Sequence, residues 1–105
     1  MKDQFGIPPD ALNQICDVFR KYPSIQKVVL YGSRAMGNYR LGSDIDLCIE
    51  SDELEFSELL AIENQIDDLL LPWKIDLLAK NKIDNPDLLQ HINRVGITIY
   101  QNPIP

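Results

Sequence analysis

Residues 31–47 of this 105-residue chain read YGSRAMGNYRLGSDIDL, and this stretch decides the fold. It follows the apolar run 28–30 and leads into a segment in which apolar and polar residues alternate. Because side chains two apart in a strand share a face, Asp44 and Asp46 point one way, opposite to the apolar residues beside them. One face of this strand therefore needs a core. The other presents two carboxylates, whose repulsion a divalent cation would relieve.

A third acid occurs in a later segment of similar pattern. Residues 73–77 read WKIDL, so Asp76 shares a strand face with Lys74 and lies opposite the apolar positions. An isolated pair of aspartates two apart is commonly just two solvated acids at the start of a strand. A site is favoured here because Gly32 and Ser33 directly follow one predicted strand, acids open the next, and another acid lies on a later strand.

The same residues resemble a known signature. Gly32 and Ser33, followed after ten residues by the triplet 44–46 (DID), resemble the signature of the DNA polymerase beta-type nucleotidyltransferase superfamily. The short length and the fuller pattern over 32–47 resemble its minimal nucleotidyltransferase (MNT) branch. Members of that branch are often antitoxins of modules whose other half is a helical HEPN ribonuclease. One departure is Met36, because many relatives have a basic residue there that can contact phosphate.

The resemblance and the residue chemistry together imply a magnesium site. Mg²⁺ prefers oxygen ligands and commonly shares one or two carboxylates with substrate phosphates. Asp44 and Asp46 would supply carboxylates to two ions, which can stabilise both the attacking and the leaving oxygen of a displacement. The resemblance gives Asp76 the third place, as a ligand of the catalytic ion that helps to deprotonate the acceptor hydroxyl.

The turn that precedes the acids is the predicted nucleotide-binding segment. Gly32 and Ser33 would hold the β- and γ-phosphates through backbone N–H groups and the hydroxyl, and Ser33 would cap a short helical turn. Arg34 and Arg40 could neutralise charge on the leaving pyrophosphate, although a role as ordinary surface arginines explains them equally well. Lys74 is a weaker candidate than the two arginines, because an ion pair with Asp76 would also explain it.

The implied reaction is nucleotidyl transfer, in which a hydroxyl attacks the α-phosphate and pyrophosphate leaves. The chain has no room for a separate acceptor domain, so we expect the acceptor to be another protein. The resemblance implies ATP as donor, a tyrosine of a HEPN toxin as acceptor, and a hetero-oligomer of the two. The alternative, from a different class, is a binding subunit that neutralises its partner by docking alone. Three intact aspartates favour the enzyme, whereas Met36 leans towards docking.

Composition limits the remaining possibilities. A formal net charge of −6 and a pI near 4.5 argue against direct nucleic-acid binding, which needs a basic surface. No apolar run reaches the ~18 residues that span a membrane, and the N-terminus lacks the apolar core of a signal peptide. We therefore expect a cytoplasmic protein without membrane contact. Cys16 and Cys48 are interpreted as reduced thiols, and the lone His91 as a surface residue.

The alternation of elements predicts a single α/β domain over residues 1–105. Because the acid-bearing strands alternate, we expect a small mixed sheet with helices on one face and an open catalytic face on the other, as in the nucleotidyltransferase fold. The predicted helices are 9–21, a segment from about 52–55 to 70, and 86–95, and the predicted strands are 27–31, 44–50, 73–78 and 97–100.

Overall fold

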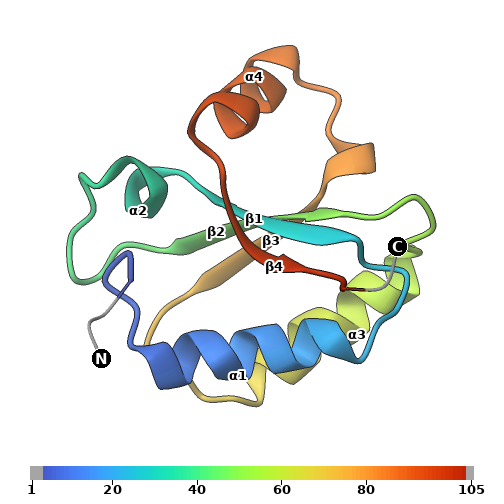
Figure 1. The fold of residues 1–105 in the computed structure, drawn as a ribbon, viewed down its shortest axis with the longest axis horizontal. Coiled ribbons are helices and arrows are strands. Elements are labelled where there is room, and N and C mark those ends of the chain that lie inside the picture. The colour runs from blue at the N-terminus through green and yellow to red at the C-terminus, as the bar shows by residue number, and fades with distance from the viewer. Residues whose placement is uncertain (1–3, 104–105) are drawn as a thin grey trace.

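A computed structural model describes residues 4–103, in which four strands form one mixed sheet. The sheet order is β3-β2-β1-β4, with β1 antiparallel to both β2 and β4 and with β2 parallel to β3 (Figure 1). This confirms the expected small α/β fold with a mixed sheet. The strands are β1 (Lys27–Tyr31), β2 (Ile45–Glu50), β3 (Ile75–Ala79) and β4 (Ile97–Gln101).

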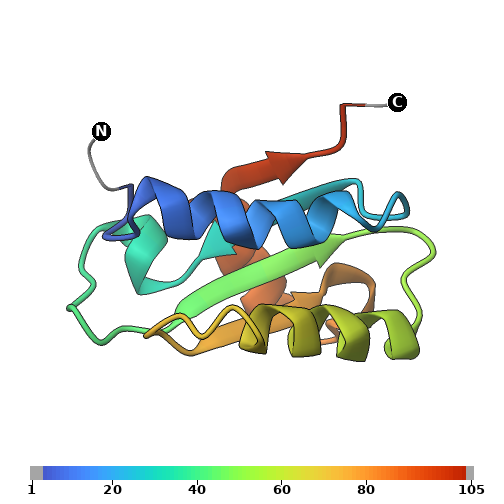
Figure 2. The same ribbon diagram turned by 90° about the horizontal axis from the view of Figure 1, so that it is seen from below.

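Helices lie on both sides of this sheet. Helices α1 and α3 cover one face and lie in front of the sheet in Figure 2, α4 lies on the opposite face, and α2 lies beyond the end of β1, where its Ala35 packs against the core on the α1 side (Figure 1). Within residues 4–103, no helix is both long and apolar enough to cross a membrane. The helical segments are α1 (Pro9–Arg20), α2 (Ser33–Met36), α3 (Phe56–Asp67), the 3₁₀ turn η1 (Lys80–Lys82) and α4 (Pro86–Val95).

The main core fills the space between the sheet and the helices α1 and α3. Phe19 of α1, Leu47 of β2 and Ile62 of α3 are each fully buried there. These positions belong to the apolar stripes of the helices and to the apolar face of the alternating strand. The opposite set of side chains on β2 is thereby turned towards the face that carries the predicted acids.

Helix α4 changes the expectation of a fully open second face. Its Ile92 packs with Val29, Tyr31 and Cys48 in a separate buried cluster on that side of the sheet. Burying an apolar helix stripe is favourable by about 25 cal/mol per Å² of apolar surface, so α4 covers part of the face instead of standing free. The acid-bearing face is therefore open beside α4 and covered beneath it.

The ends of the helices follow the sequence closely at three places. Pro9 is the first residue of α1, and the Asn85 side chain accepts bonds from the backbone N–H groups of Asp87 and Leu88 at the start of α4. Gly96 follows α4 with an extended backbone (ψ of 138°), and glycine is needed there because a Cβ would overlap the Ile92 carbonyl oxygen and the Val29 side chain. All three agree with the predicted helix boundaries.

Two local expectations are wrong. Ser33 is the first residue of α2 and not its cap, because Gly32 occupies the capping position. The predicted helix that begins at about 52–55 extends to Leu70, but the Leu70 side chain is 87% exposed. Since α3 ends at Asp67 and Leu70 has a positive φ of 55°, its side chain has left the helical pattern.

Candidate active site

The pairing of the strands sets three site residues in one row. In the parallel pairing of β2 and β3, Asp46 lies directly opposite Asp76. In the antiparallel pairing of β1 and β2, Tyr31 lies directly opposite Asp46. Paired residues of adjacent strands share a face and lie about 5 Å apart. The row therefore runs across three strands, with the two carboxylates as neighbours.

Asp44 lies just outside this row. It precedes β2 by one residue and is exposed. Its charge still reaches Asp46, since it is one of the carboxylates that raise the pKa of that group. The structure thus places Asp46 and Asp76 side by side and Asp44 at the edge of the same negative region.

The site is electrostatically unfavourable for its own acids. Burial raises the pKa of Asp46, and the neighbouring charges of Asp76 and Asp44 raise it further, while His91 and Lys74 act in the opposite direction. The Nζ atom of Lys74 lies 3.7 Å from Oδ1 of Asp76, but the two side chains are 71% and 45% exposed. An exposed ion pair of this kind contributes little, so the site retains an excess of negative charge.

The donor set fits magnesium shared with a substrate. In the part of the chain that the structure describes, no three His, Cys, Asp or Glu side chains are grouped so as to hold a metal ion by themselves. The opposed carboxylates of Asp46 and Asp76 nevertheless offer hard oxygen donors on one face. Mg²⁺ commonly binds through one or two carboxylates and substrate phosphates and not in an all-protein cage. The residues present therefore fit such an ion.

The turn between β1 and α2 lies against Asp46. Gly32 has a φ of +78°, and a Cβ at this position would overlap Oδ2 of Asp46. Only glycine avoids both the backbone strain and this overlap. Ser33 follows at the start of α2 and is partly exposed. The glycine–serine turn and the carboxylate row are therefore parts of one site.

Arg34 has a different place from the one predicted. Its side chain is 2% exposed, and its guanidinium lies over the rings of Tyr39 and Trp73, 5.1 Å and 5.8 Å from their centroids. Arg34 donates hydrogen bonds to the backbone carbonyls of Phe5 (2.9 Å), Leu41 (3.4 Å) and Ser43 (2.8 Å). A guanidinium bonded in this way ties the 38–43 loop to the N-terminal segment. It is not available to a phosphate, so the predicted nucleotide contact of Arg34 is corrected to a structural role.

Arg40 remains on the surface. Its side chain is exposed, and its backbone N–H donates to the Ser43 hydroxyl at 2.8 Å within the loop that leads to Asp44. The structure therefore keeps Arg40 accessible from solvent, in contrast to Arg34.

Two residues of the site were not predicted from the sequence. Tyr31 ends β1 in the row beside Asp46, and the ring of His91 on α4 meets the ring of Tyr31 edge to face, with centroids 6.3 Å apart. His91 was expected on the surface but is partly buried. The signal for Tyr31 was its position directly before Gly32. His91 precedes the buried Ile92 of α4, so its contact with the sheet depends on how that helix packs.

Cys48 is close to the site in sequence but not available to it. The residue is fully buried in the cluster beneath α4, and burial raises the pKa of its thiol to about 11. A neutral, buried thiol is a packing group. This agrees with its interpretation as a reduced cysteine without a chemical role.

Residues 13–104 match the protein family described as Polymerase beta, Nucleotidyltransferase. The chain belongs to this family. Its activity is nucleotidyl transfer, and this polymerase beta-type nucleotidyltransferase has the small mixed sheet of the family fold. The resemblance of its glycine–serine turn and aspartates to the family signature is thereby confirmed as family membership.

Two relatives of this nucleotidyltransferase come from Methanocaldococcus jannaschii, and both are named as protein adenylyltransferases. One is 35% identical over 84 residues, which cover 72% of this chain and 85% of the relative. The other is 35% identical over 86 residues, with the same shares of the two chains.

Solved structures share the fold of the nucleotidyltransferase at low sequence identity. A toxin–antitoxin complex with AMP-PNP matches with a TM-score of 0.71 and 21% identity, covering 88% of this chain and 74% of that chain. A complex of tri-AMPylated Shewanella oneidensis HEPN toxin with MNT antitoxin matches with a TM-score of 0.66 and 19% identity, covering 88% of this chain and 71% of that chain.

Proposed function

We propose that this nucleotidyltransferase transfers AMP from ATP to a tyrosine hydroxyl of a partner HEPN toxin and so acts as its antitoxin, within a hetero-oligomer. The observation that carries the proposal is the row in which Asp46 lies opposite Asp76, directly beside the turn of Gly32. This arrangement offers carboxylates and a glycine-lined approach at one point, as nucleotidyl transfer requires.

The chain's own residues have distinct tasks in this reaction. Backbone N–H groups of the Gly32–Ser33 turn and the Ser33 hydroxyl hold the β- and γ-phosphates. The acceptor oxygen attacks the α-phosphorus, the bond from that phosphorus to the bridging oxygen breaks, and pyrophosphate leaves. The proton of the acceptor hydroxyl passes to Asp76, which is partly open to solvent. Arg40, exposed on the adjoining loop, offers a positive charge to the leaving group.

Two magnesium ions would be held by Asp46 and Asp76, with Asp44 at the edge of the site. When bound, they would neutralise the phosphate charge and stabilise the attacking and leaving oxygens. The raised pKa of Asp46 supports this assignment, because a site that crowds carboxylates together gains from a cation.

The donor and the partner rest on the relatives. Two homologues are named as protein adenylyltransferases, which supports transfer of AMP to a protein. Structures of similar fold come from toxin–antitoxin complexes, one with AMP-PNP and one with an AMPylated HEPN toxin. They support ATP as the donor and a HEPN protein as the partner.

The test is to incubate the chain with the protein encoded beside it, ATP labelled at the α-phosphate, and Mg²⁺. We expect the label on a tyrosine of the partner, and we expect none with an Asp44→Asn/Asp46→Asn double variant. A wild-type chain that transfers no label, together with a double variant that still neutralises the partner fully, would overturn the proposal and leave neutralisation by docking.

A further inference from the structure

A groove runs along the outer edge of β3, between this strand and α3. It consists of two hollows in series, of about 340 Å³ and about 400 Å³, and Leu77 lines both. The first hollow is polar and borders Asp76, whereas the second is mainly apolar and borders Leu78 and Ala79. The groove therefore follows the strand from the candidate active site towards η1.

Strand β3 forms one edge of the sheet, with β2 on its inner side. The carbonyl of Lys74 accepts a bond of 2.9 Å from the Ile45 N–H across that inner side. Because the direction of the backbone groups alternates along a strand, the N–H and C=O groups of Ile75 and Leu77 point to the outer edge. Such an edge can accept an extended segment of another chain as an added strand.

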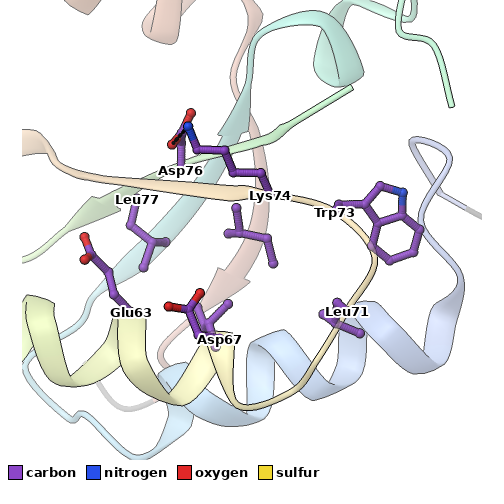
Figure 3. Close-up of a pocket in the computed structure, with 9 residues that line it drawn as sticks. Glu63, Asp67, Leu71, Trp73, Lys74, Asp76 and Leu77 are labelled. Carbon is purple, nitrogen blue, oxygen red and sulfur yellow. Dashed lines mark ion pairs between the residues drawn. The ribbon is translucent and has the colours of Figure 1, made fainter. Parts of the chain in front are cut away.

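The wall of the first hollow carries carboxylates in an unfavourable setting. Glu63 and Asp67 lie one turn apart on α3 and line the hollow on the α3 side of β3, while Asp76 and Lys74 lie across the strand (Figure 3). Like charges at this spacing destabilise a helix. Asp67 is also the last residue of α3, where the helix dipole disfavours negative charge, and the last turn holds no basic residue. A cation supplied from outside would relieve both effects.

The second hollow has the opposite character. Phe56 lines it with its side chain 69% exposed, and Leu59, Leu78 and Ile83 complete its apolar wall. Large apolar side chains gathered on an exposed groove are typical of interaction sites. The groove thus offers a place for a cationic side chain and, further along the same strand, a place for an apolar one.

We propose that the acceptor segment of the partner protein binds as an extended strand on the outer edge of β3. Because side chains alternate along a strand, an acceptor hydroxyl that faces Asp76 has neighbours that face α3. One neighbour is a lysine or arginine that pairs with Glu63 and Asp67. An apolar residue two or four positions from this basic residue fills the second hollow. This inference rests on the proposed function and adds the local sequence that the acceptor must have.

The test uses synthetic peptides of about nine residues, which span about 30 Å when extended. Each peptide has a central tyrosine. In one series a lysine lies beside the tyrosine and a leucine lies two or four residues from the lysine. In the other series glutamate replaces the lysine. Transfer of AMP from labelled ATP gives KM and kcat. Hydrogen exchange at the backbone amides of Ile75 and Leu77 reports binding independently of any transfer.

The variants separate the groove from the rest of the surface. Glu63→Lys/Asp67→Lys reverses the charge of the first hollow, and Glu53→Lys/Asp68→Lys makes the same change in net charge at exposed acids outside both hollows. We expect the first pair to raise KM for the lysine peptide by about tenfold or more, with kcat and KM for ATP unchanged, and to favour the glutamate peptide. The second pair should change KM by about twofold at most.

The outcomes distinguish this inference from the proposed function. If peptides are modified while Ile75 and Leu77 exchange as before, or if both variant pairs act equally, the edge-strand site is wrong and the transfer activity stands. If no peptide is modified but the lysine peptide protects these amides in the wild type and not in Glu63→Lys/Asp67→Lys, the site stands and the activity is wrong. If the amides of Ile75 and Leu77 become protected as the concentration of the chain alone rises, the outer edge of β3 binds a second copy of the chain, and the inference is wrong.

Discussion

Asp46 and Asp76 occupy directly opposite positions in the parallel pairing of β2 and β3, so two carboxylates meet on one face of the sheet. Their mutual repulsion adds to the burial of Asp46, and both raise the pKa of that group. Residues chosen for folding alone would not be placed in this way, because like charges directly opposite each other destabilise a sheet. The pair therefore marks a site at which stability is given up for function.

The first prediction concerns removal of one carboxylate. Asp46→Asn should reduce nucleotidyl transfer by about a hundredfold or more, since the loss of one ligand removes several kcal/mol of charge stabilisation. The same change should not lower the free energy of unfolding in metal-free buffer, because it relieves repulsion with Asp76. Activity assays and urea unfolding measure the two effects. Asp84→Asn, an exposed acid on another loop, serves as the control and should change neither.

The second prediction is a pH dependence of stability. The pKa of Asp46 is raised in the folded protein, so the folded state holds this proton more readily than the unfolded chain. The resulting stabilisation is fully present below the unfolded pKa, about 4, and is lost as the pH rises through the folded pKa. Compared with Asp46→Asn, the wild type should therefore lose unfolding free energy as the pH rises above about 4 in the presence of a chelator. A constant difference, or one of opposite sign, would contradict the assignment.

Much of the fold was predictable because it depends on local patterns. Alternating apolar residues placed β2, and a proline and an asparagine set the starts of α1 and α4. The position of α4 over the second face was not predictable, since it depends on a long-range contact between Ile92 and Val29 that no local pattern contains. For the same reason, the edge position of β3 and the groove along it became visible only in the structure.

The candidate site shows the same division. That acids open β2 and recur on β3 can be read from the sequence, but the register that sets Asp46 opposite Asp76 is a property of the strand pairing. The sequence predicts Arg34 either as a cation for the leaving pyrophosphate or as a surface arginine, and both interpretations expect an exposed side chain. Its burial depends on the carbonyl groups of Phe5 and Ser43. Phe5 is distant from Arg34 in sequence, and Ser43 is held beside the guanidinium by the fold of the 38–43 loop.

The third prediction separates the two arginines. Arg34→Met removes a buried guanidinium and leaves backbone carbonyls, including those of Phe5 and Ser43, without their donor. It should lower the free energy of unfolding by about 3 kcal/mol. Arg40→Ala, at an exposed position, should lower it by about 0.5 kcal/mol at most and should instead raise KM for ATP. Equal stability losses in the two variants by urea unfolding would show that Arg34 is not structural.

The fourth prediction concerns the reactivity of Cys48. Its thiol is fully buried beneath α4, and its pKa is raised to about 11, so the reactive thiolate is scarce and shielded at pH 8. Iodoacetamide should label Cys48 at a rate that follows unfolding and should label it fully in urea. Peptide mass spectrometry measures the modification. Rapid labelling of the folded protein would mean that α4 opens readily from the sheet.

The fifth prediction tests the close approach of the turn to the site. Gly32→Ala places a methyl group on Oδ2 of Asp46 at a φ of +78°, so it should lower the free energy of unfolding by about 2 kcal/mol and abolish transfer. Gly37→Ala has the same kind of backbone strain, at a φ of +86°, but its Cβ would have no atom of the described chain within 4 Å. It should therefore lower the free energy of unfolding by about 1 kcal/mol and retain activity.

Gly42→Ala completes the series, because its Cβ would also stand clear of the described atoms and its φ is not in the left-handed region. It should leave both stability and activity nearly unchanged or raise stability slightly. Thermal unfolding and the transfer assay rank the three variants. If Gly32→Ala and Gly37→Ala lose the same activity, backbone strain alone would explain Gly32. A loss confined to Gly32→Ala would instead assign the effect to contact with the carboxylate.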